Sequence, residues 1–417
     1  MKEKYEKLVN SKYYKVADVL IFAFMLLAST VVMTVLFYRQ SISDGSTYHS
    51  DIRPYIEEML GIQTQYSFPY PILFKTAGIL YYFTPTPEWA MVIAITSFNI
   101  LAMIIVKIIL EKQTGAGILS SLCTMSLFFL SMLFSHNLKK LGIAHTYIGV
   151  FTPNPWHNAT YMAARPFMVL AFFFGVYTLV HYEHDFAKGA AFTRYRKTAY
   201  LAFSISLLLA TLAKPSYTLV HGFTVVIIML YRLFKSRFKN LRQTILLGCY
   251  YIPTIMSLGY QYLGVFSGGS SHNDEQGIGF GFFRVWSLYT KNIPLAIALA
   301  ILFPIIVLIF HRNQLSKNNM YRFAWQIYIV AFATTAFLYE KGFRELHFNF
   351  CWGYICGIFL VFFVSMILVL KDSRYWIIQK CPPKFTLALT IEWFALIAHT
   401  LMGLYYFALL YYGSNFL

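Results

Sequence analysis

The chain has 417 residues, of which 58% are hydrophobic and only 12% are charged. Soluble domains carry about twice that share of charged residues, so the composition excludes this class. The formal net charge is +17. A charge of this size can indicate nucleic-acid binding, but here the basic residues come in short clusters at the ends of apolar stretches, which is typical of membrane proteins. We therefore expect a membrane protein that binds no nucleic acid.

Apolar stretches recur along the chain, and each predicts a helix that crosses a bilayer of about 30 Å. We predict an all-α, polytopic integral membrane protein with about eleven spans, within a range of ten to thirteen, that forms one domain over residues 1–417. The predicted spans are residues 17–38, 88–110, 116–134, 166–182, 198–213, 216–231, 244–263, 292–310, 323–338, 355–370 and 385–411.

The basic clusters also orient the predicted spans. Residues 1–16 are rich in lysine, so we expect the N-terminus in the cytoplasm and the C-terminus outside. The longer, chemically mixed loops over 135–164, 264–291 and 339–354 then lie outside. Because most of the reactive residue types are on that side, we expect the protein to work there. The five cysteines show neither metal-site spacing nor a disulfide framework.

The first outer loop begins with an amphipathic helix. From residue 52 to residue 60 the apolar residues follow the i, i+3, i+4, i+7, i+8 spacing of a helix with one apolar face. A short helix beside a span is expected to lie in the membrane interface, and residues 69–84 predict a second interface or re-entrant helix. Asp51 is at the start of the first helix, with His49 two residues before it. The simplest interpretation of Asp51 is a helix cap.

Lys214 and Pro215 join two short predicted spans. One helix through both would be about 50 Å long, which exceeds a bilayer, so we expect a hairpin whose Lys-Pro turn faces out. Proline is favoured as the first helical residue, so Lys214 would lie at a helix N-terminus, where backbone N–H groups favour an anion. The alternative is that Lys214 reaches the outer headgroups. His221, two turns further on, is expected to be a packed polar contact.

The last long outer loop carries Glu340, Arg344 and His347 at helical spacing, with Asn349 nearby. One interpretation is an ion pair between Glu340 and Arg344 within a helix. The other is an arginine that grips a phosphate through two hydrogen bonds. Arg284 lies among aromatic residues of a predicted interface segment, where an anchoring role is favoured.

Three further patterns favour a structural interpretation. Residues 272–275, His-Asn-Asp-Glu, offer metal ligands, but the spacing matches no metal motif, and a solvated loop is favoured. Residues 158–160, Asn-Ala-Thr, fit a glycosylation sequon, a tripeptide that often occurs by chance. Glu392 and His399 share a helical face within the last span. They could form a proton relay, or Glu392 could simply reach the lipid headgroups.

The segment His49-Ser-Asp-Ile-Arg-Pro-Tyr55, followed by Tyr70-Pro-Ile-Leu73, resembles the GT-C superfamily. These are polytopic glycosyltransferases that use polyprenyl- or dolichyl-phosphate sugars, and they carry acidic residues in the first outer loop. Asp51 matches the acidic position, and Tyr70-Pro-Ile-Leu73 looks like the Tyr-Pro-Pro-Leu piece that often follows. The resemblance covers residues 1–115 and, beyond them, the architecture alone. An adjacent Asp-Glu pair and a large soluble outer domain at the C-terminus are both missing, which puts the acceptor in doubt.

The resemblance implies transfer of a sugar from a polyprenyl-phosphate donor to a cell-envelope glycan or lipid-linked acceptor, at the outer face of a bacterial plasma membrane. Such transfer needs a base for the acceptor hydroxyl and cations for the departing phosphate. We expect Asp51 to be the base, tuned by Asp44 or His49. The expected phosphate-binding residues are Lys214, Arg344, Lys341 and Arg165, and further candidates for the outer cavity are His157, Glu340, His347 and Arg284.

Two alternatives to this function stay open. The first is a polysaccharide polymerase or ligase that acts on a lipid-linked oligosaccharide. The second is a transporter or flippase of lipid-linked sugars, which should show internal repeats and polar or broken helices at the membrane midplane. The sequence shows no clear repeat. No metal is required if the cations converge on the phosphate, although the need for a divalent cation is open.

Overall fold

The computed structural model describes residues 11–62, 68–134, 148–189, 193–266 and 277–414, together with residues 7 and 9. The sequence 272–275, with its metal interpretation, lies outside the described residues. The helices are α2 (Lys12–Ile42), α3 (Ile52–Met59), α4 (Ile72–Tyr81), α5 (Pro87–Thr114), α6 (Ile118–Phe129), η2 (Ile148–Val150), α7 (Ala159–Ala187), α8 (Arg194–Ala213), α9 (Ser216–Lys235), α10 (Leu241–Cys249), α11 (Ile252–Phe266), α12 (Trp286–Tyr289), α13 (Ile293–Ala300), α14 (Leu302–Phe310), α15 (Gln314–Lys317), α16 (Asn319–Phe337), η4 (Gly342–His347), α17 (Cys351–Ile378) and α18 (Pro383–Tyr411). Two short antiparallel strands, β1 (Ile278–Phe280) and β2 (Leu338–Glu340), complete the described fold.

The described helices include six that are long and apolar enough to cross a membrane, and seven if the bent pair α13–α14 counts as one span. The six are α2, α5, α7, α9, α18 and the helix that contains α17. The protein is therefore an all-α, multi-pass membrane protein. The other predicted spans fall on helices that are shorter, broken or more polar, so length and composition support fewer spans than the eleven predicted.

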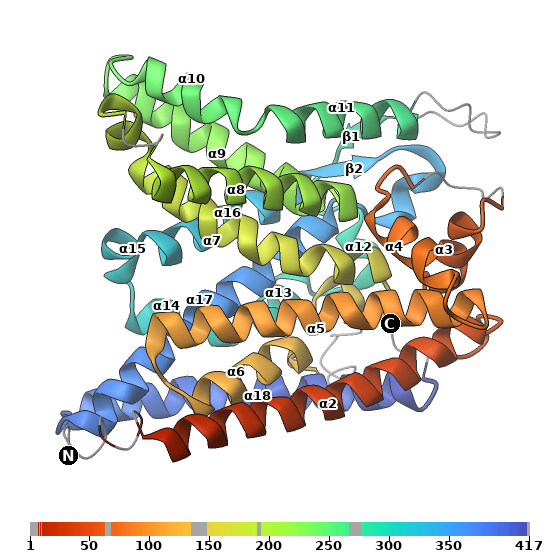
Figure 1. The fold of residues 1–417 in the computed structure, drawn as a ribbon, viewed down its shortest axis with the longest axis horizontal. Coiled ribbons are helices and arrows are strands. Elements are labelled where there is room, and N and C mark those ends of the chain that lie inside the picture. The colour runs from red at the N-terminus through yellow and green to blue at the C-terminus, as the bar shows by residue number, and fades with distance from the viewer. Residues whose placement is uncertain are drawn as a thin grey trace.

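The two ends of the helical bundle differ. Figure 1 shows α3 and α4 at one end of the long axis, and the N-terminus and α15 at the other. As the sequence predicted, α3 is amphipathic and buries Ile52, Tyr55 and Ile56. The predicted break between the fifth and sixth spans is also confirmed, because α8 ends at Ala213 and α9 begins at Ser216.

Helix α17 is the centre of the bundle, and its most apolar segment is completely buried. Two glycines allow its neighbours to approach closely. A Cβ atom on Gly353 would lie 2.5 Å from Val220 Cγ1 of α9, and one on Gly357 would lie 3.1 Å from Tyr328 Cα of α16. Small residues at such contacts are how membrane helices pack closely. The packing of α9 and α16 on α17 fixes the Lys-Pro turn relative to the segment that precedes α17.

Residues 116–134 are only partly helical, which corrects the prediction of a full span. Helix α6 ends at Phe129, and the chain continues without helix through residue 134. Non-helical backbone at membrane depth must be buried in protein and hydrogen-bonded. Here the Ser131 N–H donates to His399 O at 3.1 Å. The backbone after Phe129 can pack this closely on α18 only because residue 403 is a glycine. A Cβ atom at that position would clash with Phe129 O.

The relay between Glu392 and His399 is not formed, because each has a different partner. His399 Nδ1 donates to Ser131 O at 2.7 Å, and its Nε2 accepts the Phe303 N–H at 3.3 Å. Phe303 lies in the first turn of α14, where α13 and α14 bend by 71° and backbone N–H groups lack intrahelical acceptors. Glu392 pairs instead with His311 Nε2 at 3.0 Å. His399 therefore stabilises the bend between α13 and α14 by accepting a hydrogen bond from the backbone there.

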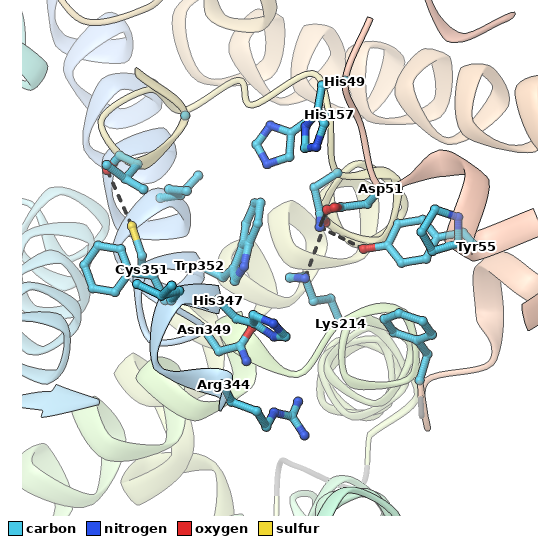
Figure 2. A pocket seen from close by; sticks show the side chains of 18 of the residues that line it. His49, Asp51, Tyr55, His157, Lys214, Arg344, His347, Asn349, Cys351 and Trp352 are labelled. Carbon is cyan, nitrogen blue, oxygen red and sulfur yellow. Dashed lines mark hydrogen bonds between the residues drawn. The ribbon is translucent and has the colours of Figure 1, made fainter. Parts of the chain in front are cut away.

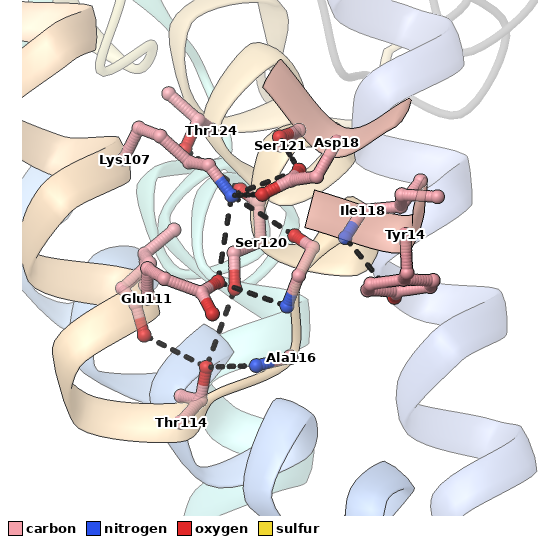
Figure 3. A network of polar contacts seen from close by, with 12 residues as sticks. Tyr14, Asp18, Lys107, Glu111, Thr114, Ala116, Ile118, Ser120, Ser121 and Thr124 are labelled. Carbon is pink, nitrogen blue, oxygen red and sulfur yellow. Dashed lines mark hydrogen bonds and ion pairs between the residues drawn. The ribbon is translucent and has the colours of Figure 1, made fainter. Parts of the chain in front are cut away.

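A partly buried ion cluster ties α2, α5 and α6 together (Figure 3). Lys107 Nζ lies 2.9 Å from Asp18 Oδ2, 3.4 Å from Glu111 Oε2 and 3.0 Å from Gly117 O. Asp18 Oδ1 also accepts the Ser121 hydroxyl at 2.6 Å. Because these groups satisfy one another, the cluster favours one arrangement of the three helices.

Candidate active site

A cavity of about 580 Å³ lies where α3, the start of α7, the α8–α9 turn and the segment before α17 meet. It lies at the end of the bundle that carries α3 and α4. Its charged and imidazole side chains are His49, Asp51, His157, Lys214, Arg344 and His347. Among the described lining residues Asp51 is the only carboxylate. The cavity thus gathers six of the predicted site residues, from four separate parts of the chain.

Asp51 immediately precedes α3, but its side chain makes no capping hydrogen bond, so the interpretation as a side-chain cap is wrong. The Ile52 N–H is bound instead by the Ser50 hydroxyl at 3.3 Å. Asp51 is half-buried, and its Oδ2 accepts Asn158 Nδ2 at 2.7 Å, while its N–H donates to His157 O at 3.0 Å. Oδ1 has no hydrogen-bond partner among the described residues. The carboxylate is therefore fixed through one oxygen and available through the other.

Asn158 links the carboxylate to the nearby cation. Its Nδ2 donates to Asp51 and, at 2.8 Å, to the Tyr55 hydroxyl. Its Oδ1 accepts Lys214 Nζ at 3.3 Å and the Tyr161 N–H at 2.9 Å, so the same side chain caps α7. Asn158 is 3% exposed. The Thr160 hydroxyl also donates to Oδ1 at 2.9 Å, so five groups depend on the position of this one amide. Figure 2 shows three of the residues concerned, Asp51, Tyr55 and Lys214, close together.

Lys214 does not reach outward to headgroups. It is 6% exposed, and its Nζ contacts Asn158 Oδ1 and, at 3.2 Å, the Thr160 hydroxyl. The ammonium group lies 4.3 Å from the ring centre of Trp352, a cation–π geometry. Burial lowers the pKa of Lys214 to about 8, and the charge of Asp51 opposes this shift. Lys214 is therefore mainly a cation at neutral pH, with little water around it.

Arg344 faces the same cavity from the segment before α17 (Figure 2). The predicted ion pair is present, because Arg344 Nε lies 3.5 Å from Glu340 Oε2, although the segment is a strand and a 3-10 helix rather than one α-helix. Tyr70 also lines the cavity. Burial raises the pKa of the Tyr70 hydroxyl, Arg344 lowers it and Asp51 raises it. Arg344 and Asp51 are thus both within electrostatic reach of Tyr70.

The histidines complete the lining of the cavity. His157 is buried, and burial lowers its pKa to about 4, so it is neutral at physiological pH. Its ring lies 5.7 Å from that of Trp352. His49 is exposed at the rim, and His347 lies beside Arg344. These imidazoles can supply hydrogen bonds to a polar ligand without adding a permanent charge.

Arg165, a predicted phosphate ligand, does not line the cavity. It is buried inside the bundle, where its Nη1 donates to Asn154 Oδ1 at 2.7 Å and its Nη2 to Asn99 Oδ1. Asn154 Nδ2 in turn donates to Leu127 O and Leu130 O, each at 2.9 Å. These are carbonyl groups at the end of α6. The position of Arg165 favours a structural role in holding that helix end.

Four other predicted residues also lie outside the cavity lining. Arg284 forms two hydrogen bonds to Glu345, at 2.6 and 3.1 Å, on the exposed surface. Lys341 precedes η4, and Glu340 acts through its contact with Arg344. Asp44 is exposed in a turn, where hydrogen bonds from Ser46 hold its pKa below the usual range.

Sequence reasoning missed Asn158 and Trp352 as members of the site. Asn158 drew attention only as part of a sequon, and Trp352 was not considered. A helix cap is a local signal that could have singled out Asn158. The contact of Asn158 with Asp51 and that of Trp352 with Lys214 each join residues more than a hundred positions apart, so no local pattern predicts them. Chemically, the assembled site offers one carboxylate facing two fixed cations, which can take a proton from a hydroxyl and hold an anion.

Comparisons with known proteins add no relative. No protein-family model matches the chain, and no curated protein sequence matches it significantly. A functional assignment therefore depends on the geometry of this cavity and on the resemblance in the first 115 residues.

Proposed function

We propose that the protein is a membrane glycosyltransferase of GT-C type, which moves a sugar from a polyprenyl-phosphate donor to an acceptor hydroxyl at the outer face of the plasma membrane. The observation that carries this proposal is the meeting of Asp51, Lys214 and Arg344 on one cavity. The cavity lies beside α3 and α4, and we expect these helices to lie in the membrane interface, near the phosphates of membrane lipids.

The proposed reaction uses these groups as follows. The acceptor oxygen attacks the anomeric carbon of the donor sugar, and its proton passes to the free Oδ1 of Asp51. The bond between that carbon and the phosphate oxygen breaks, and polyprenyl phosphate departs. Lys214 and Arg344 stabilise the negative charge on the departing phosphate. The residues of the site supply binding, orientation and proton transfer.

Asp51→Asn tests this proposal. The change keeps size and lets the amide of Asn158 still donate to the side chain, so folding and donor binding should survive. If Asp51 is the base, turnover falls by about two or more orders of magnitude. The assay uses purified protein and a panel of polyprenyl-phosphate sugars, with donor binding measured in parallel. Asp44→Asn, on the exposed turn, is the matched control and should keep wild-type turnover. Full activity in Asp51→Asn would refute the assignment.

The flippase alternative has one observation in its favour, the broken helix α13–α14. However, the backbone of Ser131 and the side chain of His399 occupy that break. Sugar transfer by the protein in detergent, where no membrane separates two sides, would distinguish an enzyme from a flippase. A polymerase or ligase would use the same cavity with a larger acceptor, and the products of the same assay would reveal it.

A further inference from the structure

A second cavity, of about 640 Å³, lies at the other end of the bundle from Asp51. It is bounded by α7, α15, the start of α16 and the later part of α17. Lys371 in its wall follows Cys351 of the first cavity along α17 by a distance of about 30 Å, at 1.5 Å per residue. Figure 1 accordingly shows α15 far from α3 and α4. This cavity has no part in the proposed sugar transfer.

The walls of the second cavity are amphiphilic. Phe173, Phe174 and Ile367 form part of an apolar floor, and both phenyl rings are only half-buried. Lys317 and Lys371 stand at the polar side, each with its side chain exposed. The described lining contains no aspartate or glutamate. A ligand that fits this surface combines an apolar chain with a negative charge.

The two lysines are not neutralised within the protein. In the described part of the chain neither forms an ion pair. Asp372 follows Lys371 directly, but its carboxylate pairs with His311 at 3.5 Å. Arg322 adds a further positive charge nearby, since it donates to Asn319, which lines the cavity. Positive charge therefore lines the part of the rim formed by α15, the start of α16 and the later part of α17.

We propose that this cavity binds an anionic membrane phospholipid. Its phosphate lies between Lys317 and Lys371, and one acyl chain covers Phe173, Phe174 and Ile367. Lysines near the surface of a membrane attract anionic lipids, and basic pockets between membrane helices are suited to anionic headgroups. The half-buried phenyl rings favour a lipid over a soluble anion, because a soluble anion would leave them exposed. Bound lipid would hold α7, α15 and α17 together.

The test is native mass spectrometry of the full chain, with equal amounts of phosphatidylglycerol and phosphatidylcholine in the detergent. We expect the wild type to retain phosphatidylglycerol over phosphatidylcholine by about tenfold or more, because each lysine favours the anionic headgroup. Lys317→Gln/Lys371→Gln should abolish that preference, and Lys317→Arg/Lys371→Arg should keep it. The matched control is Lys380→Gln/Lys384→Gln, which removes two exposed lysines beyond the same end of α17. Equal behaviour of the two glutamine variants would overturn the proposal.

Two further measurements test the acyl chain and the source of the phosphate. Ala199 lines the cavity, and Ala199→Trp should fill it and reduce retention of both lipids, while size-exclusion behaviour and melting temperature show that the variant is folded. Wild-type retention by a folded Ala199→Trp would contradict the placement of the chain. An excess of inorganic phosphate should not displace the lipid, and displacement would instead indicate a site for a soluble anion.

Discussion

Asn158 keeps the carboxylate of Asp51 and the ammonium group of Lys214 bridged rather than paired. The amide nitrogen of Asn158 donates a hydrogen bond to one carboxylate oxygen of Asp51, and the amide oxygen accepts one from the ammonium group of Lys214. In a direct ion pair the carboxylate and the ammonium group would bind each other, and fewer of their hydrogen-bonding positions would be available to a ligand. Because the amide lies between them, both charged groups can also bind a ligand in the cavity. The neutral side chain of Asn158 thus holds a carboxylate and an ammonium group close together without a direct ion pair between them.

The pH dependence of the reaction should report Lys214. Because burial lowers its pKa to about 8, Lys214 is a cation below that pH and becomes neutral above it. We expect kcat/KM for the polyprenyl-phosphate donor to fall as pH rises through about 8, because kcat/KM reports groups of the free enzyme. Lys214→Arg keeps its charge to higher pH and should lack this fall, even if its maximal rate is lower. Identical alkaline limbs in the two proteins would contradict the role of Lys214.

Substitutions of Asn158 can separate its two roles. Asn158→Ala loses the helix cap, worth about 1 kcal/mol, and also the hydrogen bonds to Asp51 and Lys214, so it should lower both stability and turnover. Asn158→Ser can still cap α7 but cannot bridge Asp51 and Lys214, so we expect a melting temperature above that of Asn158→Ala, with turnover reduced by about tenfold or more. Thermal unfolding and the transfer assay, measured on the same preparations, check both. Unchanged turnover in Asn158→Ser would show that the bridge has no role.

Among the elements, α3 and α6 show what a local pattern can and cannot predict. The stripe of Ile52, Tyr55 and Ile56 has helical periodicity, so α3 was predictable from its own residues. The residues after Phe129 are as apolar as those before it, and a buried extended segment cannot be distinguished from a buried helix by composition. Distant groups decide the end of α6, above all the Asn154 amide and the small size of Gly403.

Gly403 should therefore be intolerant of even one methyl group. Its Cβ position meets the backbone of Phe129 and Leu130, which cannot move aside as a side chain could. We expect Gly403→Ala to destabilise the protein by about 1–3 kcal/mol, the range for overpacking. Gly78→Ala in α4 is the matched control, because nothing lies within 4 Å of its Cβ position. That change should be neutral or stabilising, since alanine favours helix. Equal melting temperatures of the two variants would argue against close packing at Gly403.

For the whole molecule, the residue patterns predicted the class of protein and the candidate charges, whereas the expectation that these charges share one site came from the resemblance. Asp51, Lys214 and Arg344 were each predictable from a local context: a helix start, a Lys-Pro break and a polar loop. Their meeting on one cavity depends on how α9, α16 and α17 pack, which no local pattern specifies. The same limit hid Asn158 and Trp352, whose partners are far away along the chain.

The proposed orientation places the first cavity outside and the second inside. In a cysteine-free background, Thr47→Cys in the turn before α3 should react with a membrane-impermeant thiol reagent added to intact cells. Lys235→Cys, at the end of α9, should react only after the membrane is opened. Both positions are exposed in the structure, so access depends on the side of the membrane. The reverse labelling pattern would place the first cavity in the cytoplasm and rule out an outer-face enzyme.

The ion cluster of Asp18, Lys107 and Glu111 has a consequence for biogenesis. Asp18 belongs to the first long helix, and Lys107 is 89 positions further along the chain. In the proposed orientation Asp18 lies near the cytoplasmic end of α2, so its carboxylate can stay hydrated while the rest of α2 is inserted. Lys107 is made only after α2 has reached the membrane, so we expect the two helices to dock at this end only once α5 has been inserted. The turn before α6 would then close over the charges last.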